Sequence, residues 1–206
     1  MLKKLSVAAA GSAIATLAAV SGASAVSFSG AGGLVPTTGT SGLFESSITV
    51  TDDIIIDDIS LDFNDLTHTW SGDLVVDLTY DDGAGTVITA GVFDSVGGPT
   101  DFDGDYTFED GGAVFPGAGN PIPGGIYSPN ESFLDAFAGI NVAGTWTLSI
   151  FDQFGGDSGS LGSWDLNIEA ATVDPVSTPE PVSLFALFGI GALGVTSLKR
   201  KQKEEK

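Results

Sequence analysis

Residues 144–169 read GTWTLSIFDQFGGDSGSLGSWDLNIE and contain the two clearest strands of the chain. Each half carries the pattern Trp-x-Leu-x-Ile, which begins at Trp146 and again at Trp164, with polar residues in between. Such alternation with a period of two is typical of a half-buried β-strand. A glycine-rich loop separates the two runs. We therefore expect both tryptophans to lie in the core of a β-domain.

The same alternation continues outward from this stretch, over residues 45–170. Ile59, Leu61 and Phe63 alternate with polar residues, and no helical pattern of useful length interrupts the body of the chain. Many short strands joined by Gly and Asp turns favour an all-β fold, specifically a β-sandwich. Residues 26–44 are rich in Gly, Ser and Thr, so we expect them to form a partly disordered lead-in segment outside the sandwich.

Composition excludes several classes of function. The 206 residues include 27 Asp and Glu against 7 Lys and Arg, one His and no Cys, for a formal net charge of −20. The absence of Cys removes disulfides and thiolate sites, and a single His excludes zinc sites with two or more histidines. A strongly negative chain repels phosphate backbones, so nucleic acid is not expected as a partner.

The charges are also unevenly placed. No Lys or Arg occurs between Val26 and Leu198, although 24 of the acids lie within residues 26–178. Such a body must solvate its carboxylates or bind cations. The basic residues all belong to the two ends of the chain, namely Lys3, Lys4, Lys199, Arg200, Lys201, Lys203 and Lys206.

Calcium is the candidate cofactor, because clustered carboxylate oxygens in loops are the donors that Ca²⁺ prefers. The densest cluster lies in a glycine-containing segment that we expect to be a loop. It is not an EF-hand, because Tyr106 and Gly112 stand where that motif has Gly and Glu. The alternative is a solvated acidic loop. The candidate ligands are Asp101, Asp103, Asp105, Asp110, Asp152 and Asp157. A second cluster is a weaker candidate, since its two pairs need not converge: Asp52, Asp53, Asp57 and Asp58.

The N-terminal 25 residues have the pattern of a secretory signal peptide. Two lysines precede the apolar stretch Leu5–Val20, and Ala23 and Ala25 form a small-x-small cleavage site. We expect signal peptidase to release a mature protein that begins at Val26. The alternative is a membrane helix that is retained.

The C-terminal end carries a second membrane signal. Residues 171–181 form a linker that ends in Pro179, Glu180 and Pro181; an uncharged stretch of 17 residues follows at 182–198, and then a basic tail at 199–206. The stretch is long enough for a transmembrane helix, and the tail favours the cytoplasmic side. This order resembles the PEP-CTERM sorting signal of Gram-negative bacteria. The resemblance implies an inner-membrane anchor that an exosortase removes, with delivery to the cell surface or extracellular matrix. The alternative is a plain C-terminal anchor.

Five motifs follow one another in the body of the chain: His68-Thr-Trp-Ser-Gly-Asp-Leu74, Thr107-Phe-Glu-Asp110, Gly125-x-Tyr127-x-Pro129, Gly144-Thr-Trp146-Thr-Leu148 and Trp164-x-Leu166. Through these motifs the body resembles the P/Homo B domain of subtilisin-like proprotein convertases. The resemblance covers about residues 45–170 and implies a jelly-roll β-sandwich (galactose-binding-like). Tyr80, Asp81 and Asp82 depart from the usual Ser-Pro of one turn.

In this motif set the resemblance implies structural roles for His68, Gly72, Asp73, Trp146 and Trp164. A nucleophilic site would need the single imidazole to activate a nearby hydroxyl, and neighbouring positions in sequence do not supply that geometry. We therefore expect a turn at the entry to a strand. We expect no catalytic residue and no catalytic domain on this chain.

The sequence thus predicts an exported, non-catalytic module for adhesion, matrix structure or binding of a surface, polysaccharide or protein partner. One alternative is an accessory domain of a subtilisin-like serine endopeptidase. Another is a carbohydrate-binding module with an exposed aromatic platform. The aromatic residues available for that platform are Trp70, Tyr106, Phe115 and Tyr127.

Overall fold

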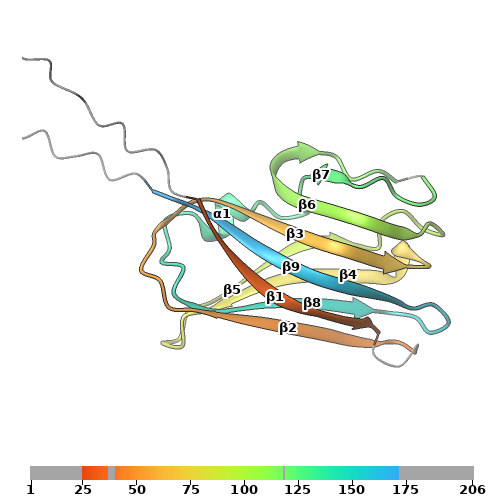
Figure 1. Cartoon of the computed structure of the whole chain (residues 1–206), viewed down its shortest axis with the longest axis horizontal. Helices are drawn as coiled ribbons and strands as arrows, with labels where there is room; N and C mark the ends of the chain where they lie inside the picture. The colour runs from red at the N-terminus through yellow and green to blue at the C-terminus, as the bar shows by residue number, and fades with distance from the viewer. Residues whose placement is uncertain (1–24, 37–39, 118, 172–206) are drawn as a thin grey trace, which may run out of the picture. The chain divides into compact units, whose positions relative to one another are not determined.

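The structure is a computed structural model, and it describes residues 25–36, 40–117 and 119–171. These residues form β-strands with one short α-helix and one 3₁₀ turn (Figure 1). The elements are β1 (Ala25–Val35), β2 (Gly42–Val50), β3 (Ile56–His68), η1 (Ser71–Asp73), β4 (Leu74–Asp81), β5 (Val87–Asp94), β6 (Phe102–Ala113), β7 (Gly125–Tyr127), α1 (Phe133–Phe137), β8 (Gly144–Asp152) and β9 (Gly159–Ala170).

The strands form two sheets that face each other. The five-stranded sheet has the order β1-β9-β3-β6-β7, and the four-stranded sheet has the order β2-β8-β4-β5. All pairings are antiparallel except that of β6 with β7. In Figure 1 the strands β1, β9 and β3 cross in front of β8 and β4. The predicted all-β sandwich is confirmed.

The core lies between the two sheets and follows the alternation of the sequence. Trp146 on β8 and Trp164 on β9 are both 0% exposed, as predicted. Trp146 packs against the rings of Tyr80 and Phe137, with centroids 4.8 and 5.1 Å away. Its indole nitrogen donates a hydrogen bond of 2.9 Å to the carbonyl oxygen of Val142, so burial leaves no polar atom of the ring unpaired.

The prediction of a lead-in segment at residues 26–44 is wrong. Residues 25–35 form β1, which pairs with β9 from Ala25 opposite Glu169 to Val35 opposite Gly159. Gly30 on this strand lies under the Trp164 ring, where an added Cβ would be 2.1 Å from the indole nitrogen. Small residues are therefore needed here for packing. Their abundance hides the period of two that marks a strand.

The predicted signals at the two ends lie largely outside the described residues. Ala23, the Pro179–Pro181 motif and the stretch at 182–198 are among them, whereas Ala25 is the first residue of β1. Within the described residues, no helix has the length and hydropathy needed to span a membrane. Signal cleavage and sorting stay predictions.

Candidate functional site

Four polar residues that the sequence singled out, two from the first motif and two candidate calcium ligands, lie where β3, η1 and β8 meet. His68 is the last residue of β3, Asp73 is the last residue of η1, and Asp152 is the last residue of β8. Asp157 follows in the loop before β9, where its carboxylate accepts a hydrogen bond of 2.9 Å from the hydroxyl of Thr69. Three of the four are buried, and only Asp157 is partly exposed.

The His68 imidazole is fixed on both sides. Its Nδ1 atom lies 3.2 Å from the backbone nitrogen of Trp70 and 3.0 Å from the carbonyl oxygen of the same residue. Its Nε2 atom lies 3.5 Å from Oδ2 of Asp152, and both side chains are completely buried. With the proton on Nε2 and none on Nδ1, the ring accepts from the Trp70 N–H and directs its own N–H at the carboxylate.

Asp152 also closes the loop that follows its strand. Its Oδ1 accepts a hydrogen bond of 3.0 Å from the backbone nitrogen of Phe154. Its Oδ2, like Nε2 of His68, has no hydrogen-bond partner within normal distance. The separation of 3.5 Å is too long for a strong hydrogen bond, so the two groups attract each other mainly through charge and dipole.

Asp73 is the third carboxylate of this cluster. Burial raises its pKa above the ordinary value of 3.8, and the charges of Asp152 and Asp157 raise it further, while His68 opposes the shift. The carboxylates therefore repel one another in a site with little solvent.

This arrangement lacks the geometry of a nucleophilic site. The only hydroxyl of the motif between His68 and Asp73 that is buried belongs to Ser71, and it donates to the carbonyl oxygen of Val96 at 2.8 Å and contacts the hydroxyl of Thr100 at 2.8 Å. It does not contact the imidazole. Gly72 packs at the same turn, where an added Cβ would lie 2.9 Å from Cα of Gly98. The motif residues lie at the turn that leads into β4.

The predicted acidic loop is a strand. Asp103 and Asp105 lie on β6 and are exposed, because Phe102, Tyr106 and Phe108 point into the core between them. Asp105 accepts a hydrogen bond of 2.8 Å from the backbone nitrogen of Asp65. The prediction of a loop was wrong. The segment contains more glycine and aspartate than aromatic residues, and this composition concealed the alternation of the aromatic residues that marks a strand.

The other predicted calcium ligands lie elsewhere. Asp101 precedes β6, and Asp110 accepts from the backbone nitrogen of Leu134 at 2.6 Å, at the first turn of α1. In residues 25–36, 40–117 and 119–171, no three His, Cys, Asp or Glu side chains are grouped so that they could hold a metal ion. The structure does not bring the predicted ligands into one site, and calcium binding stays a prediction.

The predicted aromatic platform is wrong for Tyr106 and Tyr127, and Phe115 is half-buried. Tyr106 and Tyr127 are buried, and Phe115 stacks on Phe108 with ring centroids 5.7 Å apart. Only Trp70 is exposed, at 41%. These rings pack on the core side of β6 and β7.

Sequence analysis missed a polar network on the outer face of the five-stranded sheet. Asp62 on β3 stands opposite Asp165 on β9. Asp62 accepts from the Thr107 hydroxyl at 2.6 Å and from the Asn167 amide at 2.8 Å. Asp165 accepts from the Asn64 amide at 2.7 Å and from the hydroxyl of Ser29. Neutral donors on four strands thus fix two like charges side by side.

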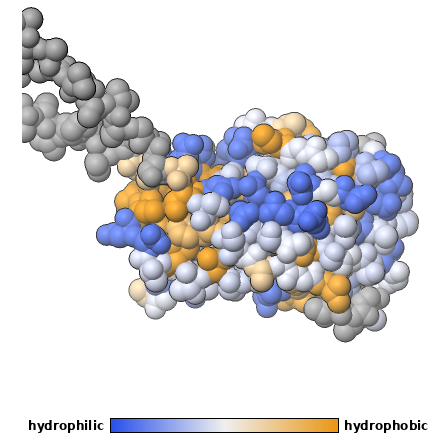
Figure 2. All heavy atoms as spheres, in the orientation of Figure 1, coloured by the Kyte–Doolittle hydropathy of each residue, from blue (hydrophilic) through white to orange (hydrophobic). Residues whose placement is uncertain are grey.

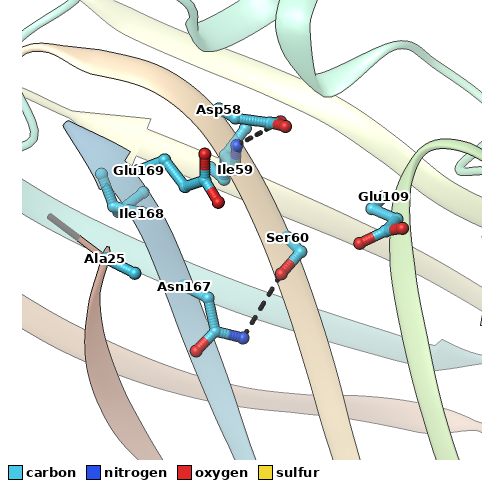
Figure 3. Close-up of a pocket in the computed structure, with 8 residues that line it drawn as sticks. All are labelled: Ala25, Asp58, Ile59, Ser60, Glu109, Asn167, Ile168 and Glu169. Atoms are coloured by element: carbon cyan, nitrogen blue, oxygen red, sulfur yellow. Dashed lines mark hydrogen bonds between the residues drawn. The ribbon is translucent and has the colours of Figure 1, made fainter. Parts of the chain in front are cut away.

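A shallow pocket lies beside this network (Figure 3). Its volume is about 110 Å³, and the carboxylates of Asp58, Glu109 and Glu169 stand around the amide of Asn167 and the hydroxyl of Ser60. The Asn167 amide lies 3.4 Å from the Ser60 hydroxyl. Glu109 and Glu169 have no hydrogen-bond or ion-pair partner among the described residues. The period of two places these residues outward, but only the register of β3, β6 and β9 brings them together.

Comparison with solved structures finds several similar chains, and two of them illustrate the low identity. One is a serine protease of Aeromonas sobria, which is 12% identical with a TM-score of 0.39; the match covers 72% of this chain and 27% of that one. The other is the same type of protease in complex with its chaperone, which is 12% identical with a TM-score of 0.36; the match covers 73% and 28%. This chain thus spans about a quarter of the length of those proteins. No curated protein matches the sequence.

Comparison with family models gives a match to the proprotein convertase P-domain over residues 56–168. The match runs from the first residue of β3 into β9 and takes in His68, Asp73, Asp152 and both core tryptophans. It covers more than half of the chain, and it agrees with the motifs that the structure places at the β3–η1 turn and in the core. The chain therefore belongs to the proprotein convertase P-domain family.

Proposed function

We propose that this chain is a non-catalytic P-domain module that binds and stabilises a subtilisin-like serine protease domain. The observation that carries the proposal is the family match over residues 56–168. P-domains are accessory domains of proteases, so the most economical role for this module is to support such a catalytic domain.

The geometry of the His68 cluster supports a role without catalysis. A general base must reach the proton that it removes, and His68 is completely buried with its two nitrogens directed at Trp70 and Asp152. The cluster connects the ends of β3 and β8, which belong to different sheets. It thus serves to hold the sandwich together at the end where the motif residues lie.

The site of action is proposed to be outside the cytoplasm. The P-domain is typical of secreted proteases, and the N-terminal pattern around Ala23 predicts export through signal peptidase. A second candidate function is display at the cell surface or in the matrix for adhesion, favoured by the Pro179–Pro181 motif with its basic tail. Mass spectrometry of the exported protein tests this second function. The Glu180→Ala variant should keep the C-terminal segment that processing removes from the wild type.

The main proposal is tested by the thermal half-life of a subtilisin-like catalytic domain produced without its own P-domain. Adding a molar excess of the purified chain should lengthen that half-life several-fold, since a ligand of the folded state slows inactivation by mass action. An unrelated acidic β-sandwich protein at the same concentration is the control. Equal half-lives with the chain and with the control would reject the proposal.

A further inference from the structure

The bond that signal peptidase is predicted to cut lies inside the folded domain. The small-x-small pattern of Ala23 and Ala25 places the cut between Ala25 and Val26. Both residues that flank this bond belong to β1, which begins at Ala25. Ala25 stands opposite Glu169 on β9, and the pairing continues through Val26. The predicted cut therefore falls in a paired strand and not in a linker ahead of the domain.

The residue after the bond is packed as well. The side chains of Val26 and Phe28 are partly buried and pack against the hydrophobic core. Figure 2 shows hydrophobic side chains gathered at the end of the domain where β1 starts. A peptidase binds an extended segment whose backbone and side chains are free to enter its cleft. While β1 is paired, Val26 meets neither condition, because its backbone belongs to the ladder and its side chain contacts the core.

Close packing prevents β1 from sliding along β9 to free the bond. A shift of two residues is the smallest that keeps the same face of a strand inward. Such a shift would bring Leu34 to the place of Gly32, where even an added Cβ would be 2.0 Å from the carbonyl oxygen of Leu161. It would also bring a valine to the place of Gly33, where an added Cβ would be 2.7 Å from the Phe44 ring. The bond is freed only when β1 leaves the sheet.

The topology leaves the bond accessible until the domain is complete. β1 is an edge strand that pairs with β9, the last strand of the described residues (Figure 1). The hydrogen bond from the Ser29 hydroxyl to Asp165 joins residues 136 positions apart in sequence. A chain that emerges from its N-terminus delivers β1 first and β9 last. Pairings between such distant segments also form slowly, because a long loop must close first.

We propose that signal-peptide cleavage and the pairing of β1 with β9 exclude each other, so that the cut between Ala25 and Val26 must precede completion of the sandwich. A chain that folds first is processed only when β1 opens again. The proposal goes beyond the binding of a protease and rests only on the proposed export of the chain. It gives β1 a second role, because the pairing of this strand ends the period in which the chain is readily processed.

The order in which folding and cleavage occur can be controlled in vitro. The full chain is unfolded in urea and then diluted into detergent micelles that contain purified signal peptidase. In a parallel sample the chain refolds first, as checked by circular dichroism, and the peptidase is added afterwards. Mass spectrometry measures the rate at which chains that begin at Val26 appear. Cleavage of the refolded chain should be slower by about tenfold or more, because it proceeds only through the fraction of molecules in which β1 is open.

The matched variant carries a Gly/Ser linker of about eight residues between Ala25 and Val26. The linker moves the cut away from β1 and leaves every residue of the sandwich after Ala25 in place. This variant should be cut after Ala25 at the same rate in both samples, because the bond no longer belongs to a paired strand. It separates local protection by β1 from any general effect of folding or of the detergent.

Equal rates for the wild type in the two samples would overturn the proposal. Resistance of the refolded linker variant would overturn it too, because the obstruction would then lie outside β1. If neither sample yields a chain that begins at Val26, the predicted cut is wrong and the proposal falls with it. The half-life of the protease domain is measured separately, so none of these results decides whether the chain binds a protease.

Discussion

The Nε2 atom of His68 lies 3.5 Å from Oδ2 of Asp152, and the two side chains are completely buried at the ends of strands in different sheets. This pair connects the two layers of the sandwich where little solvent is present to compensate a lone charge. Removing one member leaves a buried polar group of the other without its partner, which costs stability.

We expect Asp152→Ala to lower the free energy of unfolding by about 1–3 kcal/mol, because the Phe154 backbone N–H and the buried imidazole lose the carboxylate that they face. His68→Ala should also destabilise, and the double variant should lose less than the sum of the two by about 1 kcal/mol or more, because the residues interact. Urea unfolding followed by tryptophan fluorescence measures all three, since Trp146 and Trp164 are buried. Asp157→Ala, at a partly exposed site, is the control. Strict additivity would show that the pair does not interact.

Asp82, in the turn between β4 and β5, should contribute to the pH dependence of stability. Hydrogen bonds from the Thr86 side chain, then from the backbone of Thr86, Ala84 and Gly85, lower the pKa of Asp82 to about 2 from its ordinary 3.8. A lowered folded-state pKa means that the stabilisation is present above pH 3.8 and is lost as the pH falls towards 2. Asp82→Asn should therefore flatten the acid limb of the stability curve.

Asp73 should change the pH dependence of stability in the opposite direction. Its raised pKa, caused first by burial, means that ionisation costs stability as the pH rises through the folded-state value. In the wild type the free energy of unfolding should fall as the pH rises towards neutrality. Asp73→Asn should remove this fall and leave the acid limb of the curve unchanged. Denaturant unfolding of both variants from pH 2 to 7 checks the two signs; the same curve shape for both would contradict the assigned causes.

Membership of β1 in the sandwich is tested at Gly30. A Cβ at this position would lie 2.1 Å from the Trp164 indole nitrogen, so Gly30→Ala should destabilise by about 1–3 kcal/mol through overpacking. Gly117→Ala is the control, because no atom lies within 4 Å of its added Cβ. Thermal unfolding compares the two. If Gly30→Ala melts at the wild-type temperature, residues 25–35 do not pack as described.

Calcium remains a prediction from the distribution of charge. Millimolar CaCl₂ should raise the melting temperature more than NaCl of equal ionic strength does, because a specific site with a Kd of roughly 10⁻⁴–10⁻³ M adds binding free energy that screening lacks. The gain should shrink in Asp103→Asn/Asp105→Asn and persist in Asp52→Asn. Equal melting temperatures in the two salts would show that the acids are only solvated.

Sequence predicted the parts of this fold that depend on local alternation. The Trp-x-Leu-x-Ile runs identified β8 and β9 with their buried faces, and the motif from His68 to Asp73 identified a structural turn. These features succeed because a period of two is visible within a few residues.

Features that depend on register or on close packing could not be predicted. Asp62 and Asp165 are more than a hundred residues apart and meet only because β9 lies between β1 and β3. β1 was not predicted because glycine has a low propensity for strands. Its glycine is required instead by close packing against a tryptophan of another strand. Asp105 and Asp110 fall on one strand, yet Asp110 accepts a hydrogen bond from the backbone nitrogen of Leu134 at the start of α1.

The His68 cluster connects the two sheets of a module that we propose to be non-catalytic. The most direct measurement is hydrolysis of a generic protein substrate, such as casein, by the purified protein, with His68→Ala and the folded state of both checked by circular dichroism. We predict no turnover above the buffer for either protein, because the imidazole is buried and directed at Asp152. Turnover by the wild type that disappears in a folded His68→Ala variant would contradict the account.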